Sequence, residues 1–117
     1  MRYLRIYTDE HGQSRFENLE FAFTQQDFAP PAPPLDVSEP REASAVLVLR
    51  ARAGWSDAAH PTPARQLMFI LAGAWEVSAG GETRTVSAGD VVLGEDTTGP
   101  GHASRVLEDT VLAVVRL

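Results

Sequence analysis

The chain lacks cysteine entirely, and this absence removes several kinds of chemistry at once. There is no disulfide framework, no thiolate nucleophile and no cysteine-ligated zinc or iron–sulfur centre. The 117 residues are nevertheless enough to bury a core without cross-links. With 44% hydrophobic and 22% charged residues, the composition is that of an ordinary globular domain. We therefore expect a single folded domain.

Lysine is also missing, so all ten positive charges are arginines. They form no cluster longer than the pair Arg50 and Arg52, and the formal net charge is -6. A protein that binds nucleic acid normally carries a basic stripe that replaces the counterions of the phosphates. We therefore expect no nucleic-acid partner.

Long apolar runs are the third feature that the sequence lacks. No stretch approaches the roughly 18 apolar residues that a membrane span needs. The segment from Met1 to Tyr7 is charged and too short in apolar character for a signal peptide. We expect no membrane partner and a cytoplasmic location.

From Ala43 onward, short apolar runs alternate with turn residues, a pattern typical of an all-β sandwich or barrel. No segment has the periodicity of a helix. Gly80 and Gly81 predict a tight hairpin, because adjacent glycines tolerate positive φ angles. A second turn, at residues 87–90, completes a predicted β-meander. The predicted strands are 45–51, 66–72, 74–78, 83–87, 91–94, 102–107 and 110–117.

The run from Leu67 to Ala72 is apolar on both faces of its predicted strand. Such a strand has neither face in water, so another segment or a second subunit must cover the outer face. We take a homodimer as the natural candidate.

The N-terminal third has a different character. Four prolines between Pro30 and Pro34 exclude a central strand or helix, because each removes a backbone donor and fixes φ. We expect residues 1–42 to form strands and a proline-rich arm that pack on a barrel formed by residues 43–117. The arm has two interpretations, a surface connector or a lid or dimer-exchange segment, and we favour the connector.

Two segments carry spaced glycine and histidine residues: Gly54, His60 and Gly73 in the first, and Gly89, Gly99 and His102 in the second. These segments resemble the two conserved motifs of the cupin superfamily, as seen in small single-domain bacterial cupins. Gly54, His60, Thr62, Gln66 and Gly73 reproduce the spacing of the first motif, with Thr62 at a histidine position and Gln66 at a glutamate position. The second motif is matched at Gly89 and at Gly99-Pro100-Gly101-His102, whereas Thr97 and Val106 depart from its proline and asparagine. The resemblance implies a cupin-type double-stranded β-helix, or jelly-roll, barrel.

Side chains two residues apart on a strand share a face, so several polar groups should line one pocket. The predicted ligand-binding residues are His60, Thr62, Gln66, Met68, Thr98, His102 and Ser104. Met68 and the residues after it give the pocket an apolar end. Thr98 enters from the turn-rich loop at its mouth.

The metal set that the resemblance implies is incomplete. Complete cupin sites have three histidines and a carboxylate, whereas here His60, Gln66 and His102 remain. We expect at most a weak site for one divalent transition metal, because a neutral amide adds no negative charge. Three functions stay open: a binding protein for a small polar or acidic metabolite, which we favour; a metal-dependent dioxygenase or isomerase; and a dimeric structural or interaction domain with a vestigial pocket.

Other candidate residues receive structural interpretations. Glu95 and Asp96 are neighbours on one strand, so they should face opposite sides, and we expect them to cap a turn. Trp55 and Trp75 are expected to be packing or interface residues. Arg65 should pair with a carboxylate such as Glu76 or Asp57.

Overall fold

The computed structural model describes residues 1–117 and contains nine β-strands and no helix. The all-β class predicted from the sequence is therefore confirmed. No element is a helix that is long and apolar enough to cross a bilayer. The strands are β1 (Arg2–Thr8), β2 (Ser14–Glu20), β3 (Phe23–Gln26), β4 (Leu35–Ser38), β5 (Ala45–Ala51), β6 (Gln66–Ala79), β7 (Glu82–Ser87), β8 (Val91–Gly94) and β9 (Ala103–Arg116).

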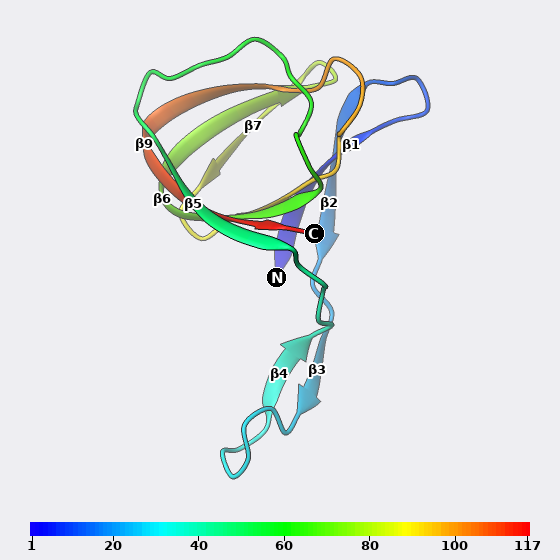
Figure 1. The fold of residues 1–117 in the computed structure, drawn as a ribbon, viewed down its shortest axis with the longest axis vertical. Coiled ribbons are helices and arrows are strands. Elements are labelled where there is room, and N and C mark those ends of the chain that lie inside the picture. Colours follow the sequence, from blue (N-terminus) through cyan, green and yellow to red (C-terminus); the bar gives the residue numbers. More distant parts are fainter.

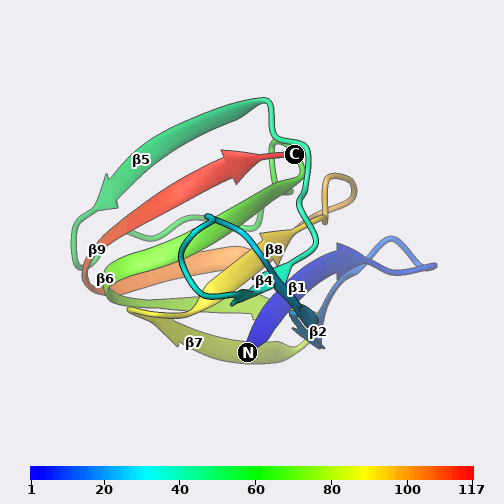
Figure 2. The ribbon, with the colours of Figure 1, turned by 90° about the horizontal axis from the view of Figure 1, so that it is seen from below.

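Seven strands form one sheet that curves round on itself as a jelly roll (Figure 1). The order is β2-β1-β8-β6-β9-β5, and β7 pairs with the second half of β6. β6 and β9 pair antiparallel along almost their whole lengths. In Figure 2 the strands β5, β9 and β6 lie side by side along one wall. The predicted strands 66–72 and 74–78 are parts of one long strand, β6. Likewise, the predicted strands 102–107 and 110–117 are parts of β9.

The long strand β6 bends at Gly73, where the pairing with β9 shifts register. Gly73 has a φ of 84°, in the left-handed region that favours glycine. A Cβ atom at this position would overlap the carbonyl of Asp109 and approach Thr110 Oγ1. Gly73 therefore lets one strand pass from one layer of the jelly roll to the other.

The predicted hairpin at Gly80 and Gly81 is confirmed, with φ angles of 56° and 79°. The predicted meander is wrong, because β8 does not pair with β7. The turn after β7 is closed by the Asp90 carboxylate, which accepts a hydrogen bond from the Ser87 amide. This turn sends β8 onto the first half of β6 and parallel to β1, whereas β7 stays on the second half.

The core lies on both faces of β6, as its apolar pattern requires. Met68 and Ile70 face the interior, where they join a cluster that includes Ile6 and Val114. Leu67 faces outward and packs in a second cluster with Tyr3, Val91 and Leu93. The N-terminal strand of the same chain therefore covers part of the outer face.

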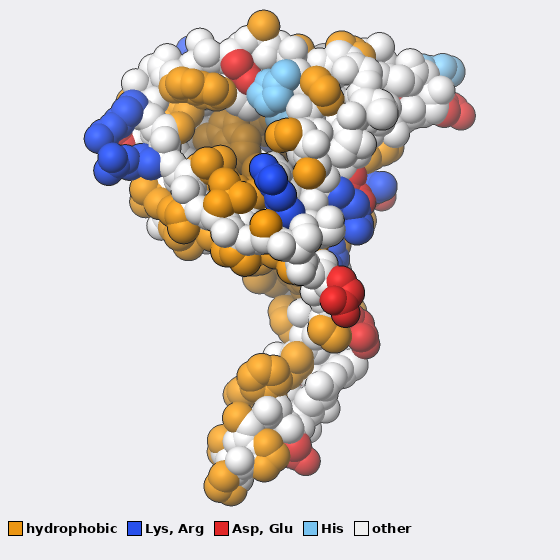
Figure 3. Space-filling view, viewed as in Figure 1, with side chains coloured by type: hydrophobic (Ala, Val, Ile, Leu, Met, Phe, Trp, Pro, Cys, Tyr) orange, Lys and Arg blue, Asp and Glu red, His pale blue; other side chains and the backbone are white.

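The N-terminal 42 residues divide into two parts with different surroundings. β1 and β2 belong to the main sheet, since β1 pairs with β2 and runs parallel to β8. The hairpin of β3 and β4 instead projects away from the jelly roll (Figures 1 and 3). Phe23, Phe28 and Leu35 on this arm are exposed, Phe28 to 67%. The arm thus packs less on the sheet than we expected.

A substitution at Gly73 tests the role of the bend. We expect Gly73→Ala to lower the free energy of unfolding by more than Gly89→Ala, measured by urea denaturation. Both glycines have positive φ, which costs roughly 1–2 kcal/mol for a residue with a side chain. Only at Gly73 does the added methyl group also collide with backbone, because nothing lies within 4 Å of a Cβ at Gly89. Equal losses for the two variants would contradict this account of the bend.

The homodimer stays a prediction. The structure indicates which exposed apolar surface would form its interface. Val46, Val48 and Leu71 lie on the outer face of β5, β9 and β6 and are exposed to 70%, 66% and 58%. Exposed apolar faces next to an open edge strand commonly mark interfaces.

We expect light scattering to give twice the monomer mass. The double variant Val46→Asp/Val48→Asp should be monomeric, while Thr85→Asp, on exposed β7, should remain dimeric. A monomeric wild type at micromolar concentration would refute the dimer.

Candidate functional site

The interior of the jelly roll contains a cavity of about 530 Å³. Figure 3 shows its mouth, with hydrophobic side chains inside and a histidine at the rim. The lining comes from β5, β6, β9 and the loop between β5 and β6. The lining residues are Leu49, Arg50, Ala51, Arg52, Trp55, His60, Thr62, Pro63, Gln66, Met68, Trp75, His102, Ser104, Val106, Thr110 and Leu112.

Two histidines face each other at one end of the cavity. His60 and His102 form an antiparallel bridge, with reciprocal backbone hydrogen bonds of 2.9 and 3.1 Å. Their ring centroids are 5.2 Å apart and the rings are inclined by 49°. Gly101 permits this approach, because a Cβ there would overlap the His60 carbonyl and its φ is 79°. The bridge therefore brings His60 and His102, which are distant in sequence, to the same end of the cavity.

The buried Asp96 carboxylate orients the His102 ring. Its Oδ2 atom lies 2.7 Å from His102 Nδ1 and accepts a second hydrogen bond of 2.7 Å from Ser14. Its Oδ1 atom accepts a bond of 2.6 Å from Thr62. Burial alone would raise the pKa of Asp96, but the bonds from His102, Thr62 and Ser14 outweigh it and hold the pKa below its ordinary value. An ionised carboxylate only accepts, so the proton lies on Nδ1 and Nε2 is left for a ligand.

A second carboxylate lies against His60, but its Oδ2 atom makes only an ion-pair contact with the ring and has no hydrogen-bond partner. Asp57 pairs with His60 Nδ1 through Oδ2, and its Oδ1 accepts a hydrogen bond of 2.7 Å from the Ser104 amide. Asp57 is thereby fixed to β9, whereas the His60 side chain is 46% exposed at the mouth. The cavity thus has a deep histidine that is hydrogen-bonded to Asp96 and a shallow one that only contacts Asp57.

The structure places six of the seven predicted ligand-binding residues in the lining: His60, Thr62, Gln66, Met68, His102 and Ser104. Two of these have their polar atoms engaged within the protein. The Thr62 hydroxyl donates to Asp96, and the Gln66 amide lies 3.6 Å from the Met68 sulfur. Thr98 is not among the lining residues; its hydroxyl lies near Thr8, 3.4 Å away.

Asp96 is the most informative residue that the sequence analysis missed. We expected it to cap a turn, whereas it is fully buried and connects Ser14, Thr62 and His102. The prediction that Glu95 faces the opposite side holds, since Glu95 pairs with Arg5 and Arg65. The signal was present in β8: extending its alternation places Asp96 on the inner side. Arg65 therefore pairs with the carboxylate of Glu95, and not with Glu76 or Asp57 as we expected.

Both tryptophans belong to the cavity lining, which the packing interpretation did not anticipate. Trp55 is half exposed at the mouth, whereas Trp75 is buried and its indole N–H has no hydrogen-bond partner. Opposite Trp75, in register on β9, lies Val106. The cavity therefore has a large apolar surface beside its histidine end.

The charge of the lining differs from that of the whole protein. The sequence carries a net charge of -6, yet the lining contains no aspartate or glutamate. It contains Arg50 and Arg52 together with the two histidines. Arg52 is paired with Asp109 at a distance of 3.3 Å. Arg50 lies on the same face of β5 as Val46 and Val48, so the two histidines are the main polar groups that a small anion would meet, with Asp57 and Asp96 behind their rings.

The donors at the histidine end were tested for a fit to a divalent metal. They comprise two imidazole nitrogens and the neutral Gln66 amide, while Asp57 and Asp96 are bonded to the far sides of the rings. No group of three or more histidine, cysteine, aspartate or glutamate side chains is placed to hold a metal ion. This donor set does not fit a tight site, and the weak site of His60, Gln66 and His102 stays a prediction.

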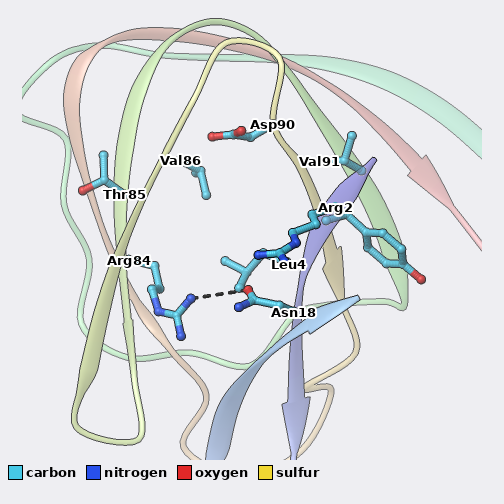
Figure 4. A pocket seen from close by; sticks show the side chains of 9 residues that line it. Arg2, Leu4, Asn18, Arg84, Thr85, Val86, Asp90 and Val91 are labelled. Carbon is cyan, nitrogen blue, oxygen red and sulfur yellow. Dashed lines mark hydrogen bonds between the residues drawn. The ribbon is translucent and has the colours of Figure 1, made fainter. Parts of the chain in front are cut away.

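A second hollow, of about 190 Å³, lies on the outside between β7 and the N-terminal strands (Figure 4). Its polar groups are already committed to one another. Arg84 bonds to Asn18 and Glu82, and Asp90 closes its own turn. This hollow has no converging free groups, so the interior cavity is the better site.

Comparison with known proteins supports the fold and leaves the function open. No family model and no curated protein matches the sequence. KdgF from Halomonas sp. superposes with a TM-score of 0.52 and 19% identity over 93% of this chain and 89% of that chain. The cupin domain of Schizosaccharomyces pombe Cnp3 gives 0.51 and 14% identity over 97% and 85%. A Streptococcus pyogenes protein of unknown function, SPY1581, gives 0.50 and 23% identity over 68% and 70%.

These likenesses, together with the jelly-roll topology, show that the chain has the cupin fold. The resemblance seen in the sequence is therefore confirmed at the level of fold. Identities this low carry no substrate or reaction to this chain.

Replacing Asp96 tests whether this carboxylate supports the site. We expect Asp96→Asn to lower the free energy of unfolding at pH 7 by about 2–3 kcal/mol, because the amide cannot accept all three hydrogen bonds. The folded-state pKa of Asp96 is lowered, so its stabilisation is present above the unfolded pKa near 4 and is lost as the pH falls through the folded value. The variant should lack that acid-dependent component.

The measurement is urea denaturation at several pH values between about 3 and 7. Asp36→Asn, on the exposed arm, is the matched control and should leave the curve unchanged. A pH dependence that is identical in wild type and Asp96→Asn would contradict the assignment.

Proposed function

We propose that this cupin-fold protein binds a small organic acid in its interior cavity. The observation that carries the proposal is the pair of histidines, His60 and His102, which face each other in the cavity lining with ring centroids 5.2 Å apart, His102 being oriented by Asp96. Because the lining has no carboxylate, the negative charge of an acid is not opposed within it. The ligand's carboxylate would bind at this histidine end to a ring that carries a proton on Nε2 as well, because an unprotonated Nε2 only accepts hydrogen bonds.

The rest of the cavity suits the body of such an acid. Met68, Trp75 and Leu112 give an apolar wall, and Ser104 adds one hydroxyl between the two ends. A few placed polar groups in a mainly apolar cavity are typical of small-molecule sites. A volume of about 530 Å³ also lies within the usual range for such sites.

The solved neighbours do not favour one activity over another. One has no known function, and the other two have different names and low identity to this chain. The metal-dependent enzyme is the first alternative, and its weakness is the neutral donor set around Gln66. A dimeric interaction domain is the second, supported by the exposed apolar face around Val46 and Val48.

Thermal unfolding with a series of acids tests the proposal. Acetate, butyrate and hexanoate are the probes, with hexanamide as the uncharged comparison. A ligand at 100 times its Kd stabilises the folded state by about 2.7 kcal/mol, which raises Tm by several degrees in a domain of this size. We expect shifts for the acids that grow with chain length, and smaller shifts for the amide.

The variant His60→Ala/His102→Ala should lose these shifts, whereas His11→Ala, in an exposed turn, should keep them. Metal analysis of untagged protein accompanies the experiment. Stoichiometric metal that is lost in the double variant would favour the metal-dependent enzyme. No metal and no shift with any acid would overturn the proposal in favour of the interaction domain.

A further inference from the structure

We propose that the projecting hairpin of β3 and β4 is a docking arm that places its apolar tip in a groove on a second copy of this chain. The exchange is reciprocal, so each of the two chains gives one arm and receives one. The inference concerns the outer surface and goes beyond the binding of an acid in the interior cavity. It is carried by the exposed apolar arm and by a groove of matching character at the base of that arm.

The arm carries a continuous apolar stretch that nothing in its own chain covers. Residues 22–36 are all exposed, and every residue from Phe28 to Leu35 is apolar. β3 and β4 pair only with each other. Figure 3 shows hydrophobic side chains along the arm as far as its tip. Apolar surface exposed in this way on a folded domain commonly marks an interaction site.

The base of the arm is fixed to the main sheet by aromatic contacts. The ring of Tyr3 stacks on Phe21 with the centroids 4.4 Å apart, and Phe21 lies 6.4 Å from Phe23. Arg41, where the chain returns from the arm, donates a hydrogen bond of 3.1 Å to Tyr3 Oη and lies over the rings of Tyr3 and Phe21. A hairpin held in this way cannot turn its tip back onto its own sheet. The surface that covers the tip therefore belongs to another molecule.

A groove of about 340 Å³ lies where the arm meets the main sheet. Phe21 and Phe23 line it from the arm side, and Phe69, Val115 and Leu117 line it from the sheet side. Grooves lined by aromatic rings are a common docking surface for proline-rich segments, which bind without a large loss of conformational entropy. The chain therefore carries both a proline-rich apolar tip and a groove suited to such a tip.

The position of the groove identifies a second copy as its occupant. The groove is at the base of the arm and the apolar tip is at the far end, so two antiparallel arms place each tip at the partner's base. A twofold axis makes the two contacts identical and closes the assembly at two chains. Val115 in the groove is also in register with Val46 on β5. The groove is therefore continuous with the outer face that the predicted homodimer would use.

The charges of the tip and of the receiving surface complement each other. Asp27 and Asp36 flank the apolar tip, are exposed and take part in no ion pair within the chain. Arg41 lines the groove and Arg50 lies on the adjoining outer face, and neither has a carboxylate partner in the chain. Glu39 is the one carboxylate in the groove lining. Two acidic tips would repel each other, whereas a tip and this surface attract.

Cross-linking tests where the tip lies, and the absence of cysteine allows one cysteine to be placed on each copy. We expect a short bismaleimide to join a copy that carries Ala29→Cys to a copy that carries Val46→Cys. One of the two copies is labelled with 15N, so mass spectrometry identifies the mixed product. Ala29→Cys mixed with Thr85→Cys, on exposed β7, is the matched control and should give only the product of random collision.

The affinity of the pair tests whether the tip supplies binding energy. We expect Phe28→Ser/Leu35→Ser to raise the Kd of the dimer by about 30-fold, because an aromatic side chain that fills a groove is typical of an interface hot spot. Both side chains are exposed in the single chain, so the fold should survive, which circular dichroism checks. Leu107→Ser, an exposed leucine on the part of β9 that pairs with the second half of β6, should leave Kd unchanged. Sedimentation over a concentration series measures Kd.

The outcomes separate arm exchange from other forms of association. A dimer whose Kd is unchanged in Phe28→Ser/Leu35→Ser, with no mixed product from Ala29→Cys and Val46→Cys, would overturn arm exchange and leave the homodimer standing. Preferential linking of two Ala29→Cys copies would show that the tips meet each other, which contradicts docking in the groove. A wild type that stays monomeric at micromolar concentration would overturn both the dimer and the exchange. Acid binding in the interior cavity is unaffected by any of these results.

Discussion

The site depends on one buried charge, the carboxylate of Asp96, which is fully buried and accepts hydrogen bonds from three separate segments. Ser14 begins β2, Thr62 lies in the loop before β6, and His102 immediately precedes β9. A buried carboxylate without hydrogen-bond donors would destabilise the folded state, so all three donors must be in place when the chain is folded. The same bonds that offset its burial also fix the tautomer of His102. Stability and the orientation of His102 therefore depend on the same atoms.

The backbone supplies the second constraint, through positions where only glycine fits. Gly73 lets β6 bend between layers, and Gly101 lets the chain pass against His60. The first places Gln66 and Met68 on one part of the cavity and Trp75 on another, all from one strand. The second brings the two imidazole rings to a centroid separation of 5.2 Å at one end of the cavity. Two small residues thus determine where the polar and apolar ends of the cavity lie.

Much of the fold could be predicted from the sequence because its signals are local. Alternation defined β5 and β8, and paired glycines defined the turn after β6. The continuity of β6 and β9 could not be predicted, since Gly73 looks like a strand end until the register with β9 is known. The position of β8 was missed for a similar reason: its pairing with β1 is non-local. The projection of the arm depends on tertiary packing that proline content alone does not specify.

The site was predicted by position more successfully than by role. His60 and His102 lie together in the cavity, as motif spacing implied, but spacing could not show that Asp57 and Asp96 stand behind them. Thr62 illustrates the difference. At a position where the cupin motif has a metal-binding histidine, its hydroxyl donates to Asp96 Oδ1.

The departures from the motif therefore form a consistent set. Gln66 removes the anionic donor that a metal would need, while Thr62 adds a hydrogen bond to the carboxylate that orients His102. The loss of metal ligands alone does not account for a buried aspartate that accepts three hydrogen bonds. Burying such a charge is destabilising unless its donors are in place. Thr62, one of the two residues that weaken the case for a metal, is also a residue that strengthens the case for an oriented imidazole.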